Sequence, residues 1–203
     1  MFTDLSGKIC KLEISRPFDC RCSTFFTTTP PQSMAKLTFL PYGYDVHKAL
    51  YDEDFAPALL GSSCKPEIGA VVVVMEYLAP PTDTVPGWIT LFDLFQQRPA
   101  LVHEKKESIR AKLDEIVLIL KHSKFVHGDL RSNNLMICCT FDTIMDPVRV
   151  KAIDMEWAGK LGEACYPDDR NEEVGYPGKA ASPIGSGDDA YMVNLWWDGL
   201  HDA

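Results

Sequence analysis

The sequence predicts an α+β fold in two lobes, with a small β-rich N-terminal part and a mainly helical C-terminal part. Residues 71–75 form an uninterrupted, largely β-branched run that is typical of a strand buried on both faces. The consecutive prolines Pro80 and Pro81 end the extended region. A helical stripe of apolar residues follows within residues 103–121. A chain of 203 residues is long enough for a compact two-lobed unit.

Several short stretches of the N-terminal part have the alternating or β-branched composition of strands. Strands are predicted over residues 8–15, 25–29, 36–39, 58–61 and 71–75. A short helix is predicted over residues 45–51, where Val46 and Leu50 share one face. We therefore place the N-terminal lobe at residues 1–78 and the C-terminal lobe at residues 79–203.

The C-terminal part contains both helical and extended stretches. Helices are predicted over residues 91–97, 103–121 and 188–200, and strands over residues 135–139 and 148–153. The stripe of the long helix consists of Ile109, Leu113, Ile116, Val117 and Leu120. Residues 159–187 are rich in Gly, Pro and Asp, which predicts an irregular segment. We expect Trp196 and Trp197 of the last helix to pack inward.

The charge and hydropathy of the chain argue against two classes of partner. The formal net charge is -9, and no stripe of Lys and Arg stands out, so a nucleic-acid ligand is not expected. The longest mainly apolar stretch, residues 68–80, is shorter than the roughly 20 residues of a membrane span. Residues 1–14 lack the pattern of a signal peptide, so a cytoplasmic or nuclear location is expected.

The seven cysteines are an odd number, which favours free thiols in a reducing compartment. Cys20 and Cys22 have the spacing that could begin a metal site. No second pair with ligand spacing follows them, so zinc is not expected.

Two polar clusters flank the predicted hairpin of residues 135–153 and carry the candidate chemistry. Asp129 is followed five residues later by Asn134, and Asp154 ends the second strand. This pattern suits phosphoryl transfer from ATP, in which Asp129 accepts a proton from the attacking hydroxyl. Asn134 and Asp154 offer the oxygen ligands that Mg²⁺ prefers. Arg131 is a candidate for stabilising the charge on the transferred phosphoryl group.

Each of these residues also has a plainer interpretation. Asp129 and Asn134 could belong to an Asx-rich turn, and Asp154 could merely end a strand. Arg131 could form a structural ion pair instead of contacting phosphate. His127 is expected to be a buried, hydrogen-bonded scaffold residue. A lysine at a strand start, such as Lys36, is often a solvated side chain.

The motifs resemble those of the protein-kinase superfamily. HGDLRSNN, residues 127–134, is similar to the catalytic loop H-R-D-L-x-x-x-N, and DMEWAG, residues 154–159, occupies the place of D-F-G. VVVVMEYL resembles the strand that enters the kinase hinge, which implies that Met75 is the gatekeeper. The resemblance further implies that the Glu76 and Leu78 backbones contact adenine. Lys36, in AKLTF, would be the lysine that binds the ATP phosphates.

A closer resemblance is to the divergent kinase-like proteins of mushroom-forming fungi. It extends from about Met34 to Leu195 and includes YG-x-x-VH, an APxL segment, V-V-M-E-Y, HGDLR-x-x-N, D-x-[DE]-W-A-G and a later YP…P-G stretch. Gly128, in place of the usual arginine, is also found in small atypical kinases and in antibiotic and choline phosphotransferases. The resemblance therefore implies no phosphorylation switch read by that arginine.

The sequence departs from the kinase pattern at several points. No G-x-G-x-x-G precedes Lys36, and Gly7 is the only glycine in the first 35 residues. The acid that should pair with this lysine could be Asp45, with Glu53 or His47 as alternatives.

Later parts of the pattern also differ. Met155 and Glu156 replace the usual Phe-Gly, and no APE motif follows. The chain ends just after the helix that contains Asp189, so we expect a truncated helical C-lobe. Asp189 itself is expected to bond the backbone of the catalytic loop.

Taken together, the residues and the resemblance predict a Mg-ATP-dependent, protein-kinase-like phosphotransferase. The resemblance implies that the acceptor is a Ser or Thr hydroxyl of an unknown protein. The alternatives are a non-catalytic pseudokinase that acts as a binding or scaffold module, a small-molecule phosphotransferase, and a truncated product of a larger kinase gene.

Overall fold

The computed structural model describes residues 1–17, 23–39, 41–65 and 69–199 of the chain. The chain forms two compact units. The N-unit consists of Met1–Tyr42 and Pro57–Leu78, and the C-unit consists of Gly43–Ala56 and Ala79–Ala203. The architecture is the predicted mixture of α and β structure.

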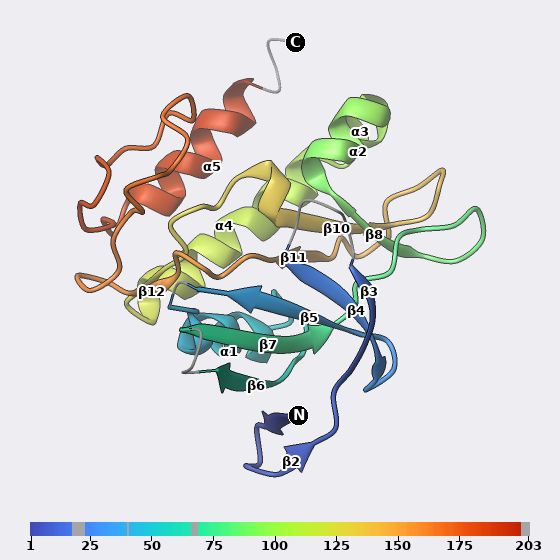
Figure 1. The fold of residues 1–203 in the computed structure, drawn as a ribbon. Coiled ribbons are helices and arrows are strands. Elements are labelled where there is room, and N and C mark those ends of the chain that lie inside the picture. The colour runs from blue at the N-terminus through green and yellow to red at the C-terminus, as the bar shows by residue number, and fades with distance from the viewer. Residues whose placement is uncertain (18–22, 40, 66–68, 200–203) are drawn as a thin grey trace. The chain divides into compact units, whose positions relative to one another are not determined.

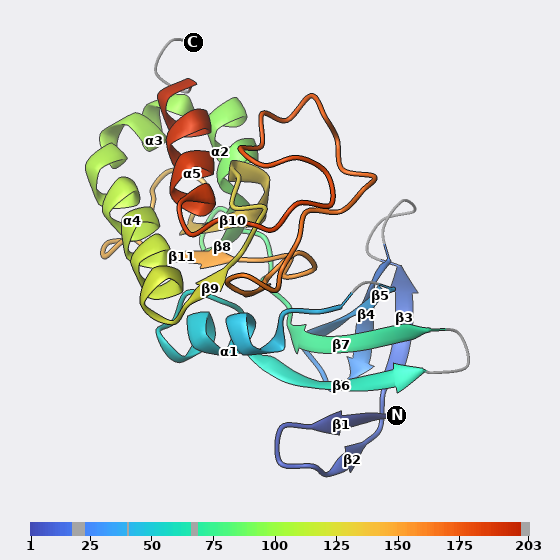
Figure 2. The same ribbon diagram turned by 90° about the vertical axis from the view of Figure 1, so that its left-hand side faces the viewer.

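An antiparallel sheet dominates the N-unit (Figure 2). Seven strands of the described residues form it in the order β2-β1-β6-β7-β5-β4-β3. The strands are β1 (Phe2–Asp4), β2 (Ile9–Cys10), β3 (Glu13–Pro17), β4 (Thr24–Thr29), β5 (Ser33–Thr38), β6 (Leu59–Lys65) and β7 (Ala70–Glu76). Figure 2 shows β6 and β7 as long neighbouring strands, with β1 and β2 beyond β6.

The central strand of this sheet is β7, as its composition predicts. It pairs with β5 on one side and with β6 on the other, and Val73 and Val74 are fully buried. β-Branched side chains fit such a pleated, buried surface well. The prediction of one strand over residues 8–15 is wrong, because its two halves have different partners. Its first half, β2, pairs with β1, whereas β3 pairs with β4 at the opposite edge of the sheet.

Helices make up much of the C-unit. They are α1 (Tyr44–Asp52), α2 (Leu91–Gln97), α3 (Pro99–Glu104), α4 (Lys106–His122) and α5 (Asp188–Gly199). In both ribbon views α4 and α5 lie side by side (Figures 1 and 2). The predicted α2 agrees with the structure. Leu200, which was predicted to continue α5, lies outside the described residues.

The predicted long helix over residues 103–121 is two helices. Pro99 begins α3 at a position where its missing N–H costs nothing. Lys105 leaves the helical conformation, with φ -103° and ψ 14°, and α4 begins after it. The predicted apolar stripe of α4 is buried at all but one of its positions, Ile109, Leu113, Ile116 and Leu120, and is half-buried at Val117.

Two small antiparallel sheets position the loops of the C-unit (Figure 1). One has the order β11-β10-β8, and the other pairs β12 with β9. Their strands are β8 (Gly87–Thr90), β9 (Phe125–Val126), β10 (Leu135–Cys139), β11 (Val150–Ala152) and β12 (Gly159–Lys160). β11 is shorter than the predicted strand over residues 148–153. An irregular segment, residues 161–187, connects β12 to α5 and contains no named helix or strand among its described residues.

Other sequence-based expectations concern cysteines, tryptophans and membranes. The described cysteines Cys10, Cys64, Cys138, Cys139 and Cys165 are free thiols, while Cys20 and Cys22 lie outside the described residues. Trp197 is buried and Trp196 is half-buried against it, with ring centroids 5.6 Å apart. Within the described ranges, no helix is both long and apolar enough to span a membrane.

Candidate active site

The HGD loop, residues 127–134, connects β9 to β10 and ends in a short 3₁₀ helix, η2 (Ser132–Asn134). His127 is completely buried at the start of this loop. Its Nδ1 accepts the backbone N–H of Asp129 at 3.3 Å, and its Nε2 lies 3.1 Å from the carbonyl oxygen of Ile153. The Nε2–H tautomer satisfies both contacts. His127 therefore joins the HGD loop to the end of the hairpin, which is the scaffold role that we expected.

Asp189 of α5 holds the same loop through its backbone. Its carboxylate accepts the N–H of His127 at 2.8 Å and the N–H of Gly128 at 2.9 Å. Burial raises the pKa of this carboxyl, and the two N–H donors oppose that shift. The expected contact between Asp189 and the loop backbone is thus present.

Gly128 is required by both its conformation and its surroundings. Its φ of +82° lies in the left-handed region that favours glycine. A Cβ at this position would lie 2.5 Å from Ile184 Cδ1 and 3.3 Å from Trp157 Cβ. The arginine of the usual kinase loop would need a left-handed backbone here and would have to displace the terminal methyl group of Ile184.

The carboxylate of Asp129 is buried in a network of donors. Its Oδ1 accepts the hydroxyl of Tyr176 at 2.7 Å, and its Oδ2 accepts the side-chain amide of Asn134 at 2.7 Å. Arg131 Nε lies 3.0 Å from Oδ1 in an ion pair. Burial raises the pKa of Asp129, and Arg131, Tyr176 and Asn134 oppose this shift. A buried carboxylate with a raised pKa is a candidate for proton transfer.

Asn134 and Asp154 lie at the same end of the β10–β11 hairpin. The register pairs Leu135 with Ala152, and the carbonyl oxygen of Asn134 accepts the N–H of Ile153 at 2.9 Å. The amide group of Asn134 donates to both Oδ2 and the backbone oxygen of Asp129. Asp154, half-exposed, has a φ of +66°, which is uncommon for a non-glycine residue.

This donor set fits a magnesium ion. Because the amide nitrogen of Asn134 is committed to Asp129, its Oδ1 is the atom that can bind a cation, together with the carboxylate of Asp154. Mg²⁺ is often held by one or two such oxygens plus substrate phosphates and water. In the described part of the chain, no group of three or more His, Cys, Asp or Glu residues could hold a metal.

Arg131 belongs to the same network as Asp129. Its side chain is one-third exposed, whereas its Nε is buried and forms an ion pair without an aligned hydrogen bond. This geometry agrees with the structural ion pair that we considered. It also leaves an exposed portion of the guanidinium side chain beside the carboxylate.

The segment after Asp154 is held against the start of α1. Met155 is fully buried, and its carbonyl oxygen accepts the N–H of Gly43 at 2.9 Å. A Cβ on Gly43 would lie 2.6 Å from the carbonyl oxygen of Ala158, so only glycine permits this approach.

Of the candidate partners for Lys36, Asp45 and Glu53 are exposed and His47 is buried.

The other predicted site residues lie in the N-unit. Lys36 of β5 is paired with Val73 of β7, and Glu76 at the end of β7 is paired with Ser33. The Glu76 N–H donates to the carbonyl oxygen of Ala58 at 2.8 Å, and the Glu76 carboxylate accepts the N–H of Ala58 at 3.0 Å. Leu78 follows the strand and is half-buried.

The remaining predicted residues are the gatekeeper candidate, Met75, and the site residues of the C-unit. Met75 is buried and pairs with Met34 across β5 and β7. In the C-unit, hydrogen bonds and an ion pair join Asp129, Arg131 and Asn134, and the hairpin register places Asp154 at the same hairpin end as Asn134.

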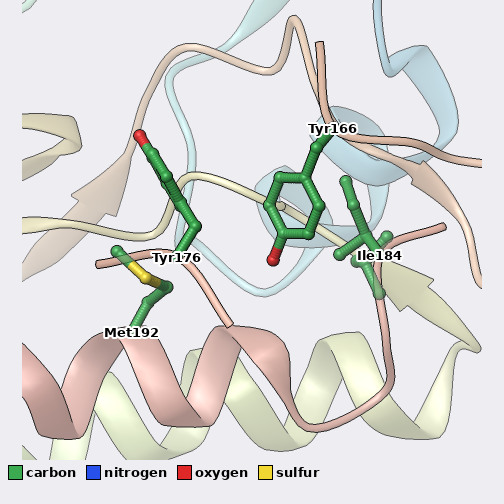
Figure 3. Packing of buried hydrophobic residues seen from close by; sticks show 5 residues of the cluster. Tyr166, Tyr176, Ile184 and Met192 are labelled. Atoms are coloured by element: carbon green, nitrogen blue, oxygen red, sulfur yellow. The ribbon is translucent and has the colours of Figure 1, made fainter. Parts of the chain in front are cut away.

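Sequence reasoning missed Tyr176. It belongs to a buried cluster with Val126, Tyr166, Ile184 and Met192. Figure 3 shows the Tyr176 side chain next to Met192 of α5, and Tyr166 between Tyr176 and Ile184. The YP…P-G stretch of the sequence contains this tyrosine, but it gives no indication that its hydroxyl reaches Asp129.

Comparison with solved structures supports the fold. No known family profile matches the sequence, and no curated protein does. Among solved structures, the kinase PK-1 of the Cydia pomonella granulovirus matches with a TM-score of 0.62 and 18% identity. The match covers 94% of this chain and 68% of that kinase. The chain has a protein-kinase-like fold.

Within the kinase-like fold, the β-rich N-unit is the small N-lobe. The predicted fold class is therefore confirmed, and the catalytic roles of the candidate residues stay predictions. An identity of 18% over this length shows shared architecture and leaves the reaction to be argued from the residues.

Proposed function

We propose that this protein is a Mg-ATP-dependent phosphotransferase of the protein-kinase type, transferring the γ-phosphoryl group of ATP to a protein Ser or Thr hydroxyl. The observation that carries the proposal is the hydrogen bond between Asn134 Nδ2 and Asp129 Oδ2 at 2.7 Å. This bond aligns a candidate base with a candidate metal ligand, next to the hairpin end that holds Asp154.

Each residue has a defined part in the proposed reaction. Asp129 orients the acceptor hydroxyl and receives its proton. The oxygens of Asn134 and Asp154 would hold Mg²⁺, which, when bound with ATP, neutralises phosphate charge. Arg131 holds Asp129 and presents positive charge beside it.

The N-unit supplies the proposed nucleotide contacts. Lys36 would bind the ATP phosphates, and the backbones of Glu76 and Leu78 would bind adenine. The motifs shared with the kinase-like proteins of mushroom-forming fungi support these roles, a relationship to that group, and a protein acceptor. An intracellular location is part of the same proposal.

Nucleotide binding is the first part to test, by thermal unfolding of the purified protein with ATP, with and without Mg²⁺. Ligand at about 100 times its dissociation constant stabilises a native protein by roughly 2.7 kcal/mol, which is readily measured. We expect a Mg²⁺-dependent rise in the melting temperature that Asp154→Asn removes. Asp142→Asn is the matched control, because Asp142 is exposed in the turn of the same hairpin. No shift in a well-folded wild-type protein would refute nucleotide binding.

Catalysis is tested separately with radiolabelled ATP and general Ser/Thr acceptors such as casein and myelin basic protein. Asp129→Asn should reduce transfer by about 10²- to 10⁴-fold, the usual contribution of a positioned proton acceptor. It should leave Mg-ATP binding nearly unchanged. Binding without transfer to any acceptor would instead identify a pseudokinase, and transfer only to small hydroxyl compounds would identify a small-molecule phosphotransferase.

A further inference from the structure

Tyr176 approaches the candidate base from the irregular segment. Its hydroxyl donates to Asp129 Oδ1 at 2.7 Å, although 47 residues separate the two in the chain. The tyrosine is only 9% exposed. Its ring centroid lies 5.2 Å from that of Trp157 and 5.7 Å from that of Tyr166. Figure 3 shows Tyr166 beside it. The hydroxyl is therefore held in place by a packed aromatic cluster.

Arg170 secures the same cluster from the irregular segment. Its guanidinium carbon lies 4.9 Å from the ring centroid of Tyr166 and 5.2 Å from that of Tyr176. The Arg170 side chain is only 5% exposed. A cation stacked on two rings restricts their movement and adds cation–π attraction.

The aromatic cluster does not by itself bring a hydroxyl to Asp129. Tyr166 shares the cluster, yet its hydroxyl donates to Asp188 Oδ2 at 2.9 Å. Tyr176 is thus distinguished from its neighbour by the partner of its hydroxyl group. The pair offers a matched comparison of two similar tyrosines.

The two oxygens of Asp129 have different partners. Oδ1 is approached by the Tyr176 hydroxyl and by Arg131 Nε, whereas Oδ2 accepts the Asn134 amide. Each carboxylate oxygen has about two lone-pair positions for donors. Oδ1 is therefore held by one hydrogen bond and one ion pair, whereas Oδ2 has a single hydrogen-bond donor and keeps one position for an acceptor hydroxyl.

We propose that Tyr176 is a positioning residue, which holds Asp129 through Oδ1 so that Oδ2 is the atom that receives the acceptor proton. The role rests on the proposed function. As the acceptor oxygen bonds to the γ-phosphorus of ATP, the bond from that phosphorus to the β–γ bridging oxygen breaks and ADP leaves. The proton of the acceptor hydroxyl passes to Asp129 Oδ2. Tyr176 keeps its own proton and remains bonded to Oδ1.

The test compares Tyr176→Phe with Tyr166→Phe, since each removes one hydroxyl from the same cluster. Tyr176→Phe should lower kcat at least about tenfold and leave the KM for ATP within about twofold, because a misplaced base slows the chemical step. Tyr166→Phe should keep kcat within about threefold of wild type. Equal kcat values for Tyr176→Phe and wild type would overturn the proposal, as would equal losses in both variants.

Fluorine NMR of protein labelled with 3-fluorotyrosine tests the contact without catalysis. The Tyr176 signal is identified by its absence from Tyr176→Phe, and Asp129→Asn should shift it. Asp198→Asn, an exposed change on α5, should not shift it. A Tyr176 signal that is unchanged in Asp129→Asn would also overturn the proposal.

The two levels of failure are distinguishable. An active wild-type protein that is indifferent to Tyr176→Phe refutes only the positioning role. A wild-type protein that binds Mg-ATP and transfers to no acceptor refutes the proposed function, and the positioning role with it.

Discussion

Individual residues of the HGD loop show how closely local conformation and packing are matched. Gly128 has a left-handed backbone conformation. A Cβ added at this position would lie against Ile184 and Trp157. The loop can then turn toward α5, where Asp189 binds its N–H groups. The arginine of the usual kinase loop would be strained here by the left-handed backbone and by the methyl group of Ile184.

Replacing this glycine should therefore destabilise the protein. Gly128→Ala adds backbone strain of about 1–2 kcal/mol and overpacking of about 1–3 kcal/mol. Gly162→Ala is the control, because Gly162 also has a positive φ, +87°, but no atom lies within 4 Å of its added Cβ. Urea unfolding should show the larger loss for Gly128→Ala. Equal losses in the two variants would contradict the packing argument.

Asp129 gives a prediction about the pH dependence of transfer. Burial raises the pKa of this carboxyl above its ordinary value of 3.8. Only the ionised form accepts a proton, so kcat should fall as the pH decreases through this raised pKa. The decline should begin at a higher pH than for an ordinary aspartate, in a profile measured between about pH 4 and pH 8. Constant kcat down to the ordinary aspartate range, in protein shown to remain folded, would contradict it.

At the scale of elements, α5 anchors the HGD loop from a distant part of the chain. Its second residue, Asp189, accepts two backbone N–H groups of the loop within 2.9 Å. The first residue, Asp188, accepts the hydroxyl of Tyr166 and the N–H of Gly185. The start of one helix thus holds both the HGD loop and the irregular segment.

Asp189→Asn should loosen the HGD loop. An amide offers one acceptor oxygen, so one of the two buried N–H groups loses its partner and faces a second donor. We expect a loss of about 1–3 kcal/mol in the free energy of unfolding. Hydrogen exchange at the amides of His127 and Gly128 should become faster. Asp198→Asn serves as the control in α5, and undiminished protection of both amides would contradict the anchoring role.

The start of the long predicted helix and the predicted strand over residues 8–15 differ from the structure for a shared reason. In each, the periodicity is correct within short stretches, but a single residue or a change of partner divides the element. Lys105 separates α3 from α4, and residues 11–12 separate β2 from β3. Periodicity indicates which face of an element is apolar. It does not indicate which other element that segment will pair with.

At the scale of the whole molecule, the charge balance leads to a further prediction. The formal net charge of -9 opposes binding to a phosphate backbone. We expect no binding to duplex DNA or single-stranded RNA at protein concentrations up to about 100 μM, where nonspecific nucleic-acid binders saturate. Fluorescence anisotropy at low salt, with a basic nucleic-acid-binding protein as positive control, measures this. Salt-dependent binding in the micromolar range would contradict the prediction.

The whole chain also shows that architecture persists at low identity. The granulovirus kinase shares the fold at 18% identity and a TM-score of 0.62. A fold of this kind depends on buried patterns, such as β7 and the stripe of α4, more than on particular residues. Function depends on particular residues, so the motifs and the fold contribute separate support for the proposal.

Sequence alone was sufficient for several features whose physical cause lies among neighbours in the chain. The β-branched run of β7, the stripe of α4 and the spacing of Asp129 and Asn134 are local patterns, and the structure contains all of them. The contact of Asp189 with the HGD loop was expected from the kinase resemblance alone. No local pattern predicts a hydrogen bond between residues that are 62 positions apart in the chain.

Tertiary structure alone decided the surroundings of the candidate base. The bond from Tyr176 to Asp129, the approach of Gly43 to Met155 and the steric requirement for Gly128 join segments that are distant in sequence. Their geometry follows from how helices, hairpin and irregular segment pack, and composition or spacing within any one segment carries no information about it.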